Sequence, residues 1–476
     1  MGNFIPLLAP SCRFGRDYRR GFAFGPHLAR PPPAGASSHG ARRIALGALS
    51  WIFVGFSFGL FGPGLLGNEG AWQLKQNRAA VNEISNEISF KSVFYDLKLS
   101  FLELPDSFSL FSSTRPGPSV AFHEPTEQAY FALNNPGTTL ITASTTEFEA
   151  GEVLLASAAL GPNKLQQANQ VSLSELDSRI SFVPDIGISG DRLVFSNVEL
   201  RKNCFVFQVW AAELGSKALE NLVPEVVMEI PECIALQDSP TGEVSLFQSG
   251  GAIASGGPGV TFVSIGDFGL GVSTNEDYSE RPPLISGGPL GVVMRIDANG
   301  AASVLTSGHR NPQGLFMNSN SGDLWSTEHG PRGGGELNLL VEGSDYGWPD
   351  VTLGAPYGSN LNDGNWEVGR YGSNHESFAK PIYSWLPSIA PSALVAYTGN
   401  EFTAWSGDLI VSSLRDEALH RVRISDSRVL FVERIPIGER DSETLRIRDL
   451  VSVSDGRLLL TFDSGQVAIM RVDAPN

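Results

Sequence analysis

Residues 308–349 read GHRNPQGLFMNSNSGDLWSTEHGPRGGGELNLLVEGSDYGWP, and this stretch decides the fold. It is dense in glycine, proline and asparagine, and short apolar runs lie between the turn residues. One run, from Asp323 to Thr327, has the length and pattern of a short strand that follows an Asn-Ser-Gly turn. The stretch therefore predicts short β-strands joined by tight turns.

Polar residues stand where these strands begin and end. Arg310 and Asn311 put a planar cation and an amide directly before the rigid Pro312. Gly330 adopts conformations that other residues avoid, and Pro331 lacks an N–H, so we expect both carbonyls to point toward a ligand. A plain array of β-turns is the alternative interpretation of the same residues.

Short apolar runs between turn signals recur through the rest of the chain from about Asp96 onward. They repeat a unit of turn, strand, polar motif and strand at intervals of about 40 to 55 residues, as the blades of a β-propeller do. A pair of β-sandwiches is the structural alternative.

Composition limits the possible partners. Hydrophobic residues make up 42% of the 476 residues and charged residues 18%, so the chain can bury a sizeable core. The formal net charge of −17 argues against nucleic acid as a partner.

The N-terminal part has its own organisation. Residues 1–43 hold seven arginines and one acid, and we expect a basic, disordered cytoplasmic leader. Residues 44–66 carry no charge and are long enough to cross the hydrocarbon core as a transmembrane anchor. The arginines before this run predict a cytoplasmic N-terminus and an outward-facing remainder. A cleaved signal peptide and a mis-chosen start codon are the alternatives.

Residues 67–94 are expected to form a membrane-proximal linker. Apolar residues at helical spacing predict a short amphipathic helix from Gly70 to Phe90 within it.

Three cysteines are present. Cys12 falls in the basic leader, whereas Cys204 and Cys233 fall on the predicted outer side. In an oxidising compartment these two are expected to form a disulfide, with two buried free thiols as the alternative.

The motifs GHRNPQGL, EHGPRGG, ELNL and DYGWP, in this order and spacing, resemble those of the soluble quinoprotein sugar dehydrogenases, the glucose/sorbosone dehydrogenase family. The resemblance implies an all-β fold, a six-bladed β-propeller over residues 95–476. It also implies pyrroloquinoline quinone (PQQ) bound on top of the propeller, with Ca²⁺ beneath the quinone edge.

The resemblance also implies which residues hold the cofactor. PQQ is a flat tricarboxylate, and arginine recognises carboxylates with a planar, bidentate fork. The positions that match the family are Arg310, Asn311, Arg415, Arg446 and Arg448. Each arginine taken alone is most simply a solvated surface charge.

Calcium takes oxygen ligands, including backbone carbonyls. By resemblance, Gly330 and Pro331 would present carbonyls to the cofactor's metal. A second calcium in the family would use Glu336 and Tyr346. Gly335 departs from the family, which has an acid there, so Glu336 alternatively braces a turn.

The larger departure concerns the general base. Gln248 stands where the family has its catalytic histidine, and Ala252 where it has an arginine. An amide does not accept a proton near pH 7, whereas general-base catalysis typically contributes about 10²–10⁴-fold. His329 is the favoured substitute base, with a turn histidine as its plain interpretation. His309, His375 and Asp267 are the other candidates.

These features give two functional hypotheses. The first is a membrane-anchored, periplasmic or extracellular oxidoreductase that transfers hydride from a sugar or polyol hydroxyl to PQQ and passes electrons to a membrane acceptor. The second is a non-catalytic propeller that binds a glycan or a protein partner.

Overall fold

The chain divides into two units, Met1–Ala79 and Ala80–Asn476. The computed structural model describes residues 87–102, 117–134, 138–144, 170–172, 182–202, 204–215, 222–231, 233–235, 238, 244–271, 284–285, 287–354, 375–437 and 445–473, all in the second unit. The predicted leader, the anchor and most of the predicted linker lie outside these residues.

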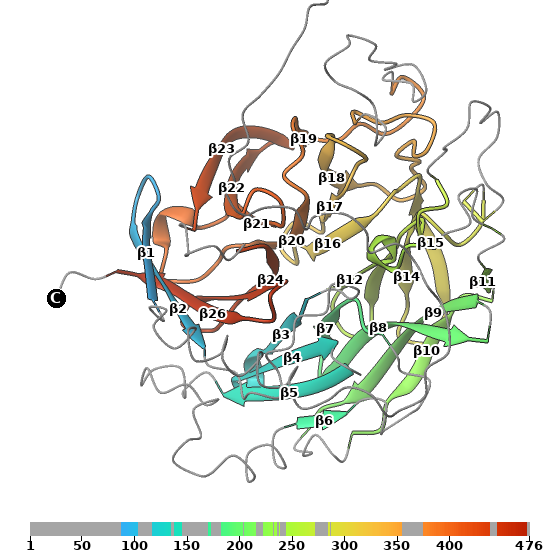
Figure 1. The fold of residues 1–476 in the computed structure, drawn as a ribbon, viewed down its shortest axis with the longest axis horizontal. Helices are drawn as coiled ribbons and strands as arrows, with labels where there is room; N and C mark the ends of the chain where they lie inside the picture. The colour runs from blue at the N-terminus through green and yellow to red at the C-terminus, as the bar shows by residue number, and fades with distance from the viewer. Residues whose placement is uncertain are drawn as a thin grey trace, which may run out of the picture. The chain divides into compact units, whose positions relative to one another are not determined.

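The described strands form six antiparallel sheets (Figure 1). The first three in chain order consist of β3 (Ser119–His123), β4 (Gln128–Asn134), β5 (Thr138–Ser144) and β6 (Gln170–Ser172); of β7 (Ile186–Ser189), β8 (Arg192–Arg201), β9 (Cys204–Glu213), β10 (Glu225–Glu229) and β11 (Ile234–Ala235); and of β12 (Gly250–Ser255), β13 (Thr261–Ile265), β14 (Val292–Ile296) and β15 (Ala302–Ser307).

The other three consist of β16 (Pro312–Met317), β17 (Leu324–Glu328), β18 (Gly335–Leu340) and β19 (Tyr383–Trp385); of β20 (Pro391–Ala396), β21 (Leu409–Ser413), β22 (Ala418–Ser425) and β23 (Arg428–Pro436); and of β24 (Ile447–Ser452), β25 (Leu458–Phe462) and β26 (Val467–Val472) with β1 (Glu87–Lys91) and β2 (Asp96–Leu102). Within the described ranges, the helical elements are the 3-10 turns η2 (Glu124–Thr126), η7 (Leu246–Gln248) and η8 (Thr403–Trp405). The all-β prediction is confirmed.

One strand from each sheet lines a common centre (Figure 1). Each of these strands contacts the next, and the last contacts the first, in the order β3, β7, β12, β16, β20 and β24. We call these six the first strands. They form a closed ring, so residues at their ends come together although they are far apart in the sequence.

Buried hydroxyl groups join neighbouring sheets. Ser264 on β13 donates to the carbonyl of Pro312 at 2.9 Å, and Ser392 on β20 donates to the carbonyl of Ile447 at 2.7 Å. Thr327 on β17 donates to the carbonyl of Ser392 at 2.5 Å. Each bond satisfies a buried carbonyl at the start of the next first strand, so the hydroxyls fix the sheets against one another.

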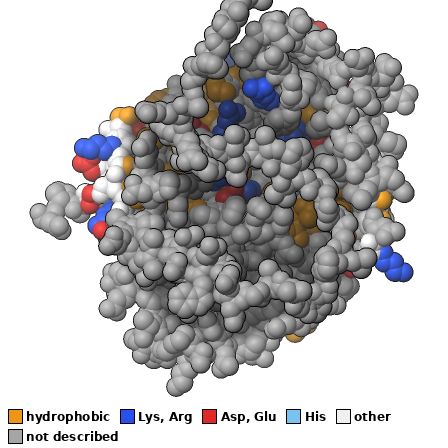
Figure 2. Space-filling view, in the orientation of Figure 1, with side chains coloured by type: hydrophobic (Ala, Val, Ile, Leu, Met, Phe, Trp, Pro, Cys, Tyr) orange, Lys and Arg blue, Asp and Glu red, His pale blue; other side chains and the backbone are white. Residues whose placement is uncertain are grey.

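The sixth sheet closes the ring with strands from both ends of the described chain. β2 pairs with β26 in a register that sets Leu99 opposite Met470, both fully buried. β1 pairs in turn with β2, and Phe90 lies opposite Leu97. Figure 2 shows basic, acidic and apolar side chains together at the edge of the molecule over β1 and β2.

β1 corrects part of the sequence interpretation. The helix expected over Gly70–Phe90 lies mostly outside the described residues, but its last four residues, from Glu87, are strand. The apolar residues at helical spacing also suit a strand, and pairing with β2 decides between the two. The sheet therefore begins eight residues before the expected domain start at residue 95.

Two further findings concern membrane-spanning helices and the cysteines. Over the part of the chain that the structure describes, no helix has the length and apolar character needed to cross a membrane. Cys204 and Cys233 form a disulfide, with Cα atoms 5.6 Å apart, where β11 pairs with the start of β9.

Candidate functional site

Asn311, directly before β16, joins its own sheet to η7 and the start of β12. Its Nδ2 donates to the carbonyl of Phe247 at 3.0 Å, and its Oδ1 accepts from the backbone N–H of Gly250 at 3.1 Å. The same oxygen accepts from Nε2 of Gln313 at 3.0 Å. Because Asn311 is 1% exposed, these bonds hold its amide in one orientation.

The hydrogen-bonded chain continues from Gln313 to two arginines. Oε1 of Gln313 accepts from Nη1 of Arg448 at 2.9 Å. Asp463, in the turn after β25, accepts from Nε of Arg448 at 2.8 Å and from Nε of Arg446 at 2.9 Å. Burial alone would raise the pKa of Asp463, but the charges of Arg448 and Arg446 outweigh it and lower that pKa. One carboxylate thus faces two guanidinium groups, which leaves a net positive charge for an anionic ligand.

Arg310 is buried and faces the turn after β17. Its Nη1 donates to the carbonyls of His329 and Gly330 at 3.1 and 3.0 Å, and its guanidinium lies 5.5 Å from the centre of the Trp348 ring. The Gly330 carbonyl therefore points at a guanidinium cation.

His329 lies among these arginines. Burial lowers its pKa to about 3, assisted by the charges of Arg448, Arg310 and Arg446. The Pro391 carbonyl accepts a hydrogen bond from its ring, and Nε2 is buried with no hydrogen-bond partner among the described residues. The imidazole is therefore neutral near pH 7, with one ring nitrogen available to a ligand.

The other candidate bases have partners. Nδ1 of His309 lies 2.7 Å from Glu328 and its Nε2 lies 2.9 Å from Thr306, so both ring nitrogens are engaged. Asp267 accepts from two backbone N–H groups and from the Trp348 indole at 2.8 Å. Burial raises the pKa of Asp267 despite the nearby Arg310. His375 is buried, at 7% exposure.

Gln248 ends η7 beside this network. Its carbonyl accepts from the backbone N–H of Phe268 at 3.0 Å and leaves no room for a Cβ at Gly266, so a glycine is required there. Its side-chain Oε1 is buried and has no hydrogen-bond partner within the described ranges. A buried, unpartnered carbonyl oxygen suits a donor on a bound ligand.

Ala252 and Arg415, two further positions that match the family, lie apart from this hydrogen-bonded network. Ala252 is 2% exposed and packs in an apolar cluster with Phe262 and Val293. Arg415 is exposed at the turn between β21 and β22. Arg415 can reach a ligand from solvent, whereas position 252 belongs to the core.

Glu336 and Tyr346, the predicted second calcium pair, lie on β18 and in the loop that follows it, and both are buried. Burial and the nearby Glu328 raise the pKa of Glu336 to about 8, so its carboxyl is mostly protonated near pH 7. The Tyr346 hydroxyl donates to the carbonyl of Leu339 and accepts from the N–H of Val341 at 3.1 Å. A Cβ at Gly335 would lie 2.6 Å from the Ser388 hydroxyl, so the family's acid has no room there.

Backbone irregularities position several of these side chains. The pairing register shifts between Gly250 and Ile253, between Pro312 and Gly314, and between Ile447 and Asp449. Such bulges re-aim side chains next to functional sites. Gln313 and Arg448 lie at two of them, and basic side chains, in blue in Figure 2, are visible near the middle of the face that it presents.

Comparisons with known proteins show which family the chain resembles. A family model described as Glucose / Sorbosone dehydrogenase matches residues 232–471. The aldose sugar dehydrogenase YliI of Escherichia coli (strain K12) is 29% identical over 233 residues, 48% of this chain and 60% of that protein. The quinoprotein glucose dehydrogenase B of Acinetobacter calcoaceticus is 27% identical over 219 residues, 36% of this chain and 45% of that protein. The chain thus spans about half the length of these curated relatives.

Solved structures resemble the chain over a larger share. A glucose dehydrogenase has 23% identity and a TM-score of 0.57, covering 79% of this chain and all of that one. The PQQ-bound form of an aldose sugar dehydrogenase from Streptomyces coelicolor has 16% identity and a TM-score of 0.51, covering 79% and 98%. At these identities the likeness concerns the fold.

Proposed function

The chain belongs to the glucose/sorbosone dehydrogenase family, and from this premise we propose that it is a quinoprotein that oxidises a sugar or polyol hydroxyl with PQQ. We further propose that its six sheets are the blades of a six-bladed propeller. The observation that carries the activity is the chain of hydrogen bonds Asp463–Arg448–Gln313–Asn311, with His329 among Arg310, Arg446 and Arg448.

The residues present fit PQQ. Arg446 and Arg448 share one carboxylate, Arg415 is exposed beside them in the family pattern, and Nε2 of His329 and Oε1 of Gln248 are buried without partners in the described residues. Arg310, Asn311, Arg415, Arg446 and Arg448 would hold the tricarboxylate. When bound, the quinone supplies the two-electron acceptor for hydride from the sugar C–H bond.

The chain's own residues must manage the hydroxyl proton. Gln248 can orient a substrate hydroxyl but cannot take its proton. His329 can accept a hydrogen bond at Nε2, but the field of three arginines makes it a weak base in the free protein. An anionic ligand on those arginines would raise the pKa of His329 and make it a better base.

The residues expected to hold calcium do not fit the ion in this arrangement. Arg310 donates to the Gly330 carbonyl, and there is no room at Gly335 for the acid that the family has beside Glu336. A cation is not favoured beside a guanidinium group. Calcium therefore has no role in the proposed function.

The test is cofactor titration of the full chain. PQQ is added to wild type and to Arg448→Gln, with Arg434→Gln as the matched control because Arg434 is an exposed arginine paired with Asp416. We expect wild type and the control to bind alike and Arg448→Gln at least tenfold more weakly, since charged hydrogen bonds contribute roughly 1.5–3 kcal/mol. Reduction of an artificial acceptor with a panel of aldoses and polyols then measures turnover. Equal binding by all three proteins would contradict the site.

One observation favours a second function. The family base is replaced by Gln248, and the substitute His329 has a pKa of about 3. A propeller that binds a glycan or a protein without turnover is the alternative. Tight PQQ binding with no turnover of any aldose or polyol would support it.

We also propose that residues 44–66 attach the protein to a membrane. The domain then faces outward and passes its electrons to an acceptor in the membrane. The uncharged run and the arginines before it support this topology. Truncation before Gly70 should release the domain from membranes, and a truncated protein that still sediments with membranes would contradict the anchor.

A further inference from the structure

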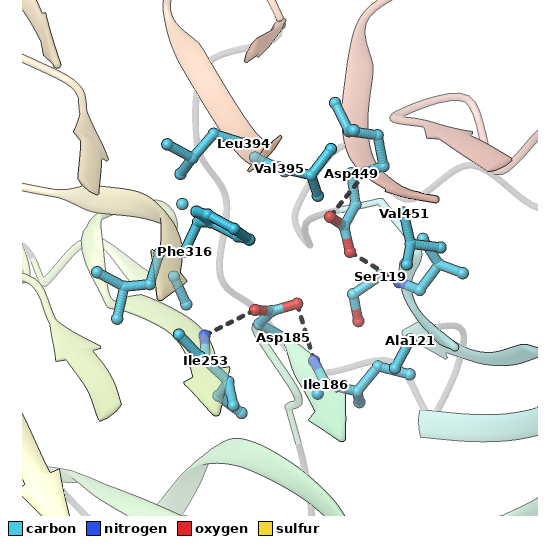
Figure 3. A pocket seen from close by; sticks show the side chains of 18 of the residues that line it. Ser119, Ala121, Asp185, Ile186, Ile253, Phe316, Leu394, Val395, Asp449 and Val451 are labelled. Atoms are coloured by element: carbon cyan, nitrogen blue, oxygen red, sulfur yellow. Dashed lines mark hydrogen bonds between the residues drawn. The ribbon is translucent and has the colours of Figure 1, made fainter. Parts of the chain in front are cut away.

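A cavity of about 290 Å³ lies between the six first strands. Residues from all six, including Ser119, Asp185 and Asp449, line it (Figure 3). Arg448 and Gln313 also line this cavity, so it adjoins the proposed cofactor site. Ser119, Asp185 and Asp449 have no role in that cofactor site.

Two aspartates from different sheets reach into the cavity with fixed orientations. Asp185 accepts from the backbone N–H of Ile186 at 2.8 Å and of Ile253 at 3.0 Å. Asp449 accepts from the N–H of Leu450 at 2.8 Å and of Val120 at 2.7 Å. Each carboxylate is thus anchored by two sheets, and both keep part of their surface accessible.

Ser119 adds a third polar side chain at the same place. Ser119 is 2% exposed, and its hydroxyl is buried without a hydrogen-bond partner among the described residues. Figure 3 shows this hydroxyl and the two carboxylates pointing into one space. Because an unpartnered buried hydroxyl is unfavourable, the three side chains together indicate a ligand that donates hydrogen bonds.

The two aspartates and one arginine set the charge in the cavity. Burial, and then the neighbouring Asp449, raise the pKa of Asp185 well above its ordinary value. Burial raises the pKa of Asp449 to about 6. Arg448 is the cation in the lining, and its charge opposes these shifts of pKa, but Asp463 shares that charge through an ion pair at 2.7 Å.

The remaining walls are apolar. Figure 3 shows Phe316, Leu394, Val395 and Val451 around the same space. Calcium takes six to eight oxygen ligands and magnesium keeps most of its waters, and neither arrangement suits such walls. An alkyl group does suit them, and the Phe316 ring offers a face to a cation.

We propose that this cavity binds a small primary alkylammonium ion. The three N–H donors of the ammonium group match the oxygens of Asp185, Asp449 and Ser119. The positive charge pairs with the two aspartate side chains, and the alkyl chain packs on the apolar wall.

Calorimetric titration of the full-length protein at pH 7 tests the proposal without PQQ. The probe is butylammonium chloride, and butyltrimethylammonium chloride is the control because it has the same charge and butyl chain but no N–H. We expect saturable binding of the first and at least tenfold weaker binding of the second. Equal binding of both, or binding of CaCl₂ but not of butylammonium, would overturn the proposal.

Variants identify the site. Ser119→Ala should weaken butylammonium binding about twofold to tenfold, the range of one neutral hydrogen bond, and Asp449→Asn by more than tenfold. Asp426→Asn, an exposed acid in the turn between β22 and β23, is the matched control and should bind as wild type. Thermal melting checks that each variant is folded. If Asp449→Asn fails to fold, Ser119→Ala and the comparison of the two ions still test the site. Unchanged affinity of Ser119→Ala for butylammonium would refute the proposed binding site.

Discussion

Nη1 of Arg448 lies 2.9 Å from Oε1 of Gln313, so that β24 is tied to β16 although β20 lies between them in the ring. Gln313 passes the contact to Asn311, which reaches Phe247 beside β12. Three hydrogen bonds therefore connect β24, β16 and the segment before β12.

Replacing the linking residue tests this surface. Gln313→Ala removes the partner of both Arg448 and Asn311, so both side chains gain rotamer freedom. We expect PQQ affinity to fall about twofold to tenfold, less than for one full charged hydrogen bond, because Asp463 and Gly250 still hold Arg448 and Asn311. Fluorescence titration measures it, with Asn299→Ala in the exposed β14–β15 turn as control. Unchanged affinity would mean that the chain of bonds does not orient the site.

Besides burial, the pKa of His329 depends on the positive charges of Arg310, Arg446 and Arg448. Its value of about 3 in the free protein means that the ring stays neutral as the pH falls to 4, which NMR titration of the imidazole would detect. Arg446→Gln removes one of the three cations and should raise this pKa, whereas Arg434→Gln should not. Addition of PQQ should raise it further. A free-protein pKa near 6.5 would contradict the assignment.

The same group makes stability pH-dependent. Because the folded pKa of His329 lies below the unfolded value near 6.5, its contribution is present above pH 6.5 and is lost as the pH falls toward 3, at up to about 1.4 kcal/mol per pH unit. Urea unfolding of wild type and His329→Gln at pH 7 and pH 4.5 measures the difference. Parallel losses in both proteins would exclude His329 as the source.

Restoring the family base tests the enzyme hypothesis. Gln248→His should raise PQQ-dependent turnover, by up to about 10²-fold at the lower end of general-base effects. Adding Ala252→Arg, the other family residue, should instead destabilise the fold, since position 252 is 2% exposed and overpacking alone costs roughly 1–3 kcal/mol. Wild-type turnover that is already fast and collapses in His329→Ala would instead assign the base to His329.

Glu336 makes the opposite contribution to pH dependence. Its folded pKa of about 8 exceeds the unfolded value near 4.5, so stability from this group is present below pH 4.5 and is lost as the pH rises toward 8. Glu336→Gln should therefore gain stability relative to wild type between pH 5 and pH 8. Thermal melts at both pH values measure the gain. A rise in wild-type melting temperature with CaCl₂ that Glu336→Gln lacks would restore the calcium interpretation.

The sequence predicted the residues that lie in conspicuous motifs. Arg310, Asn311 and His329 were identifiable because turn residues surround them, and the structure brings them together. Gln313 lies in the same motif, but its role does not follow from the sequence, because the direction of its side chain depends on the register shift between Pro312 and Gly314. Asp463 carries no local signal at all, since its role arises only when the turn after β25 meets β24.

Position 252 and residues 87–90 show why a local sequence pattern does not determine the structure. Ala252 matches a family site residue in order along the chain, but its side chain packs in the core. Residues 87–90 have helical spacing, yet β2 provides a strand partner. In both cases long-range packing decides what a local pattern leaves open.

The closing sheet determines when the fold can be completed. Ser89 donates to Asp473 across a sequence separation of 384 residues, and β2 has no partner in its sheet other than β1 until β26 has been synthesised. Such a non-local pairing is slow, because the entropy of closing the loop is lost before the contact forms. During translation the edge of β2 that pairs with β26 therefore stays unpaired until the last strand is made, and an unpaired strand edge can pair with another chain.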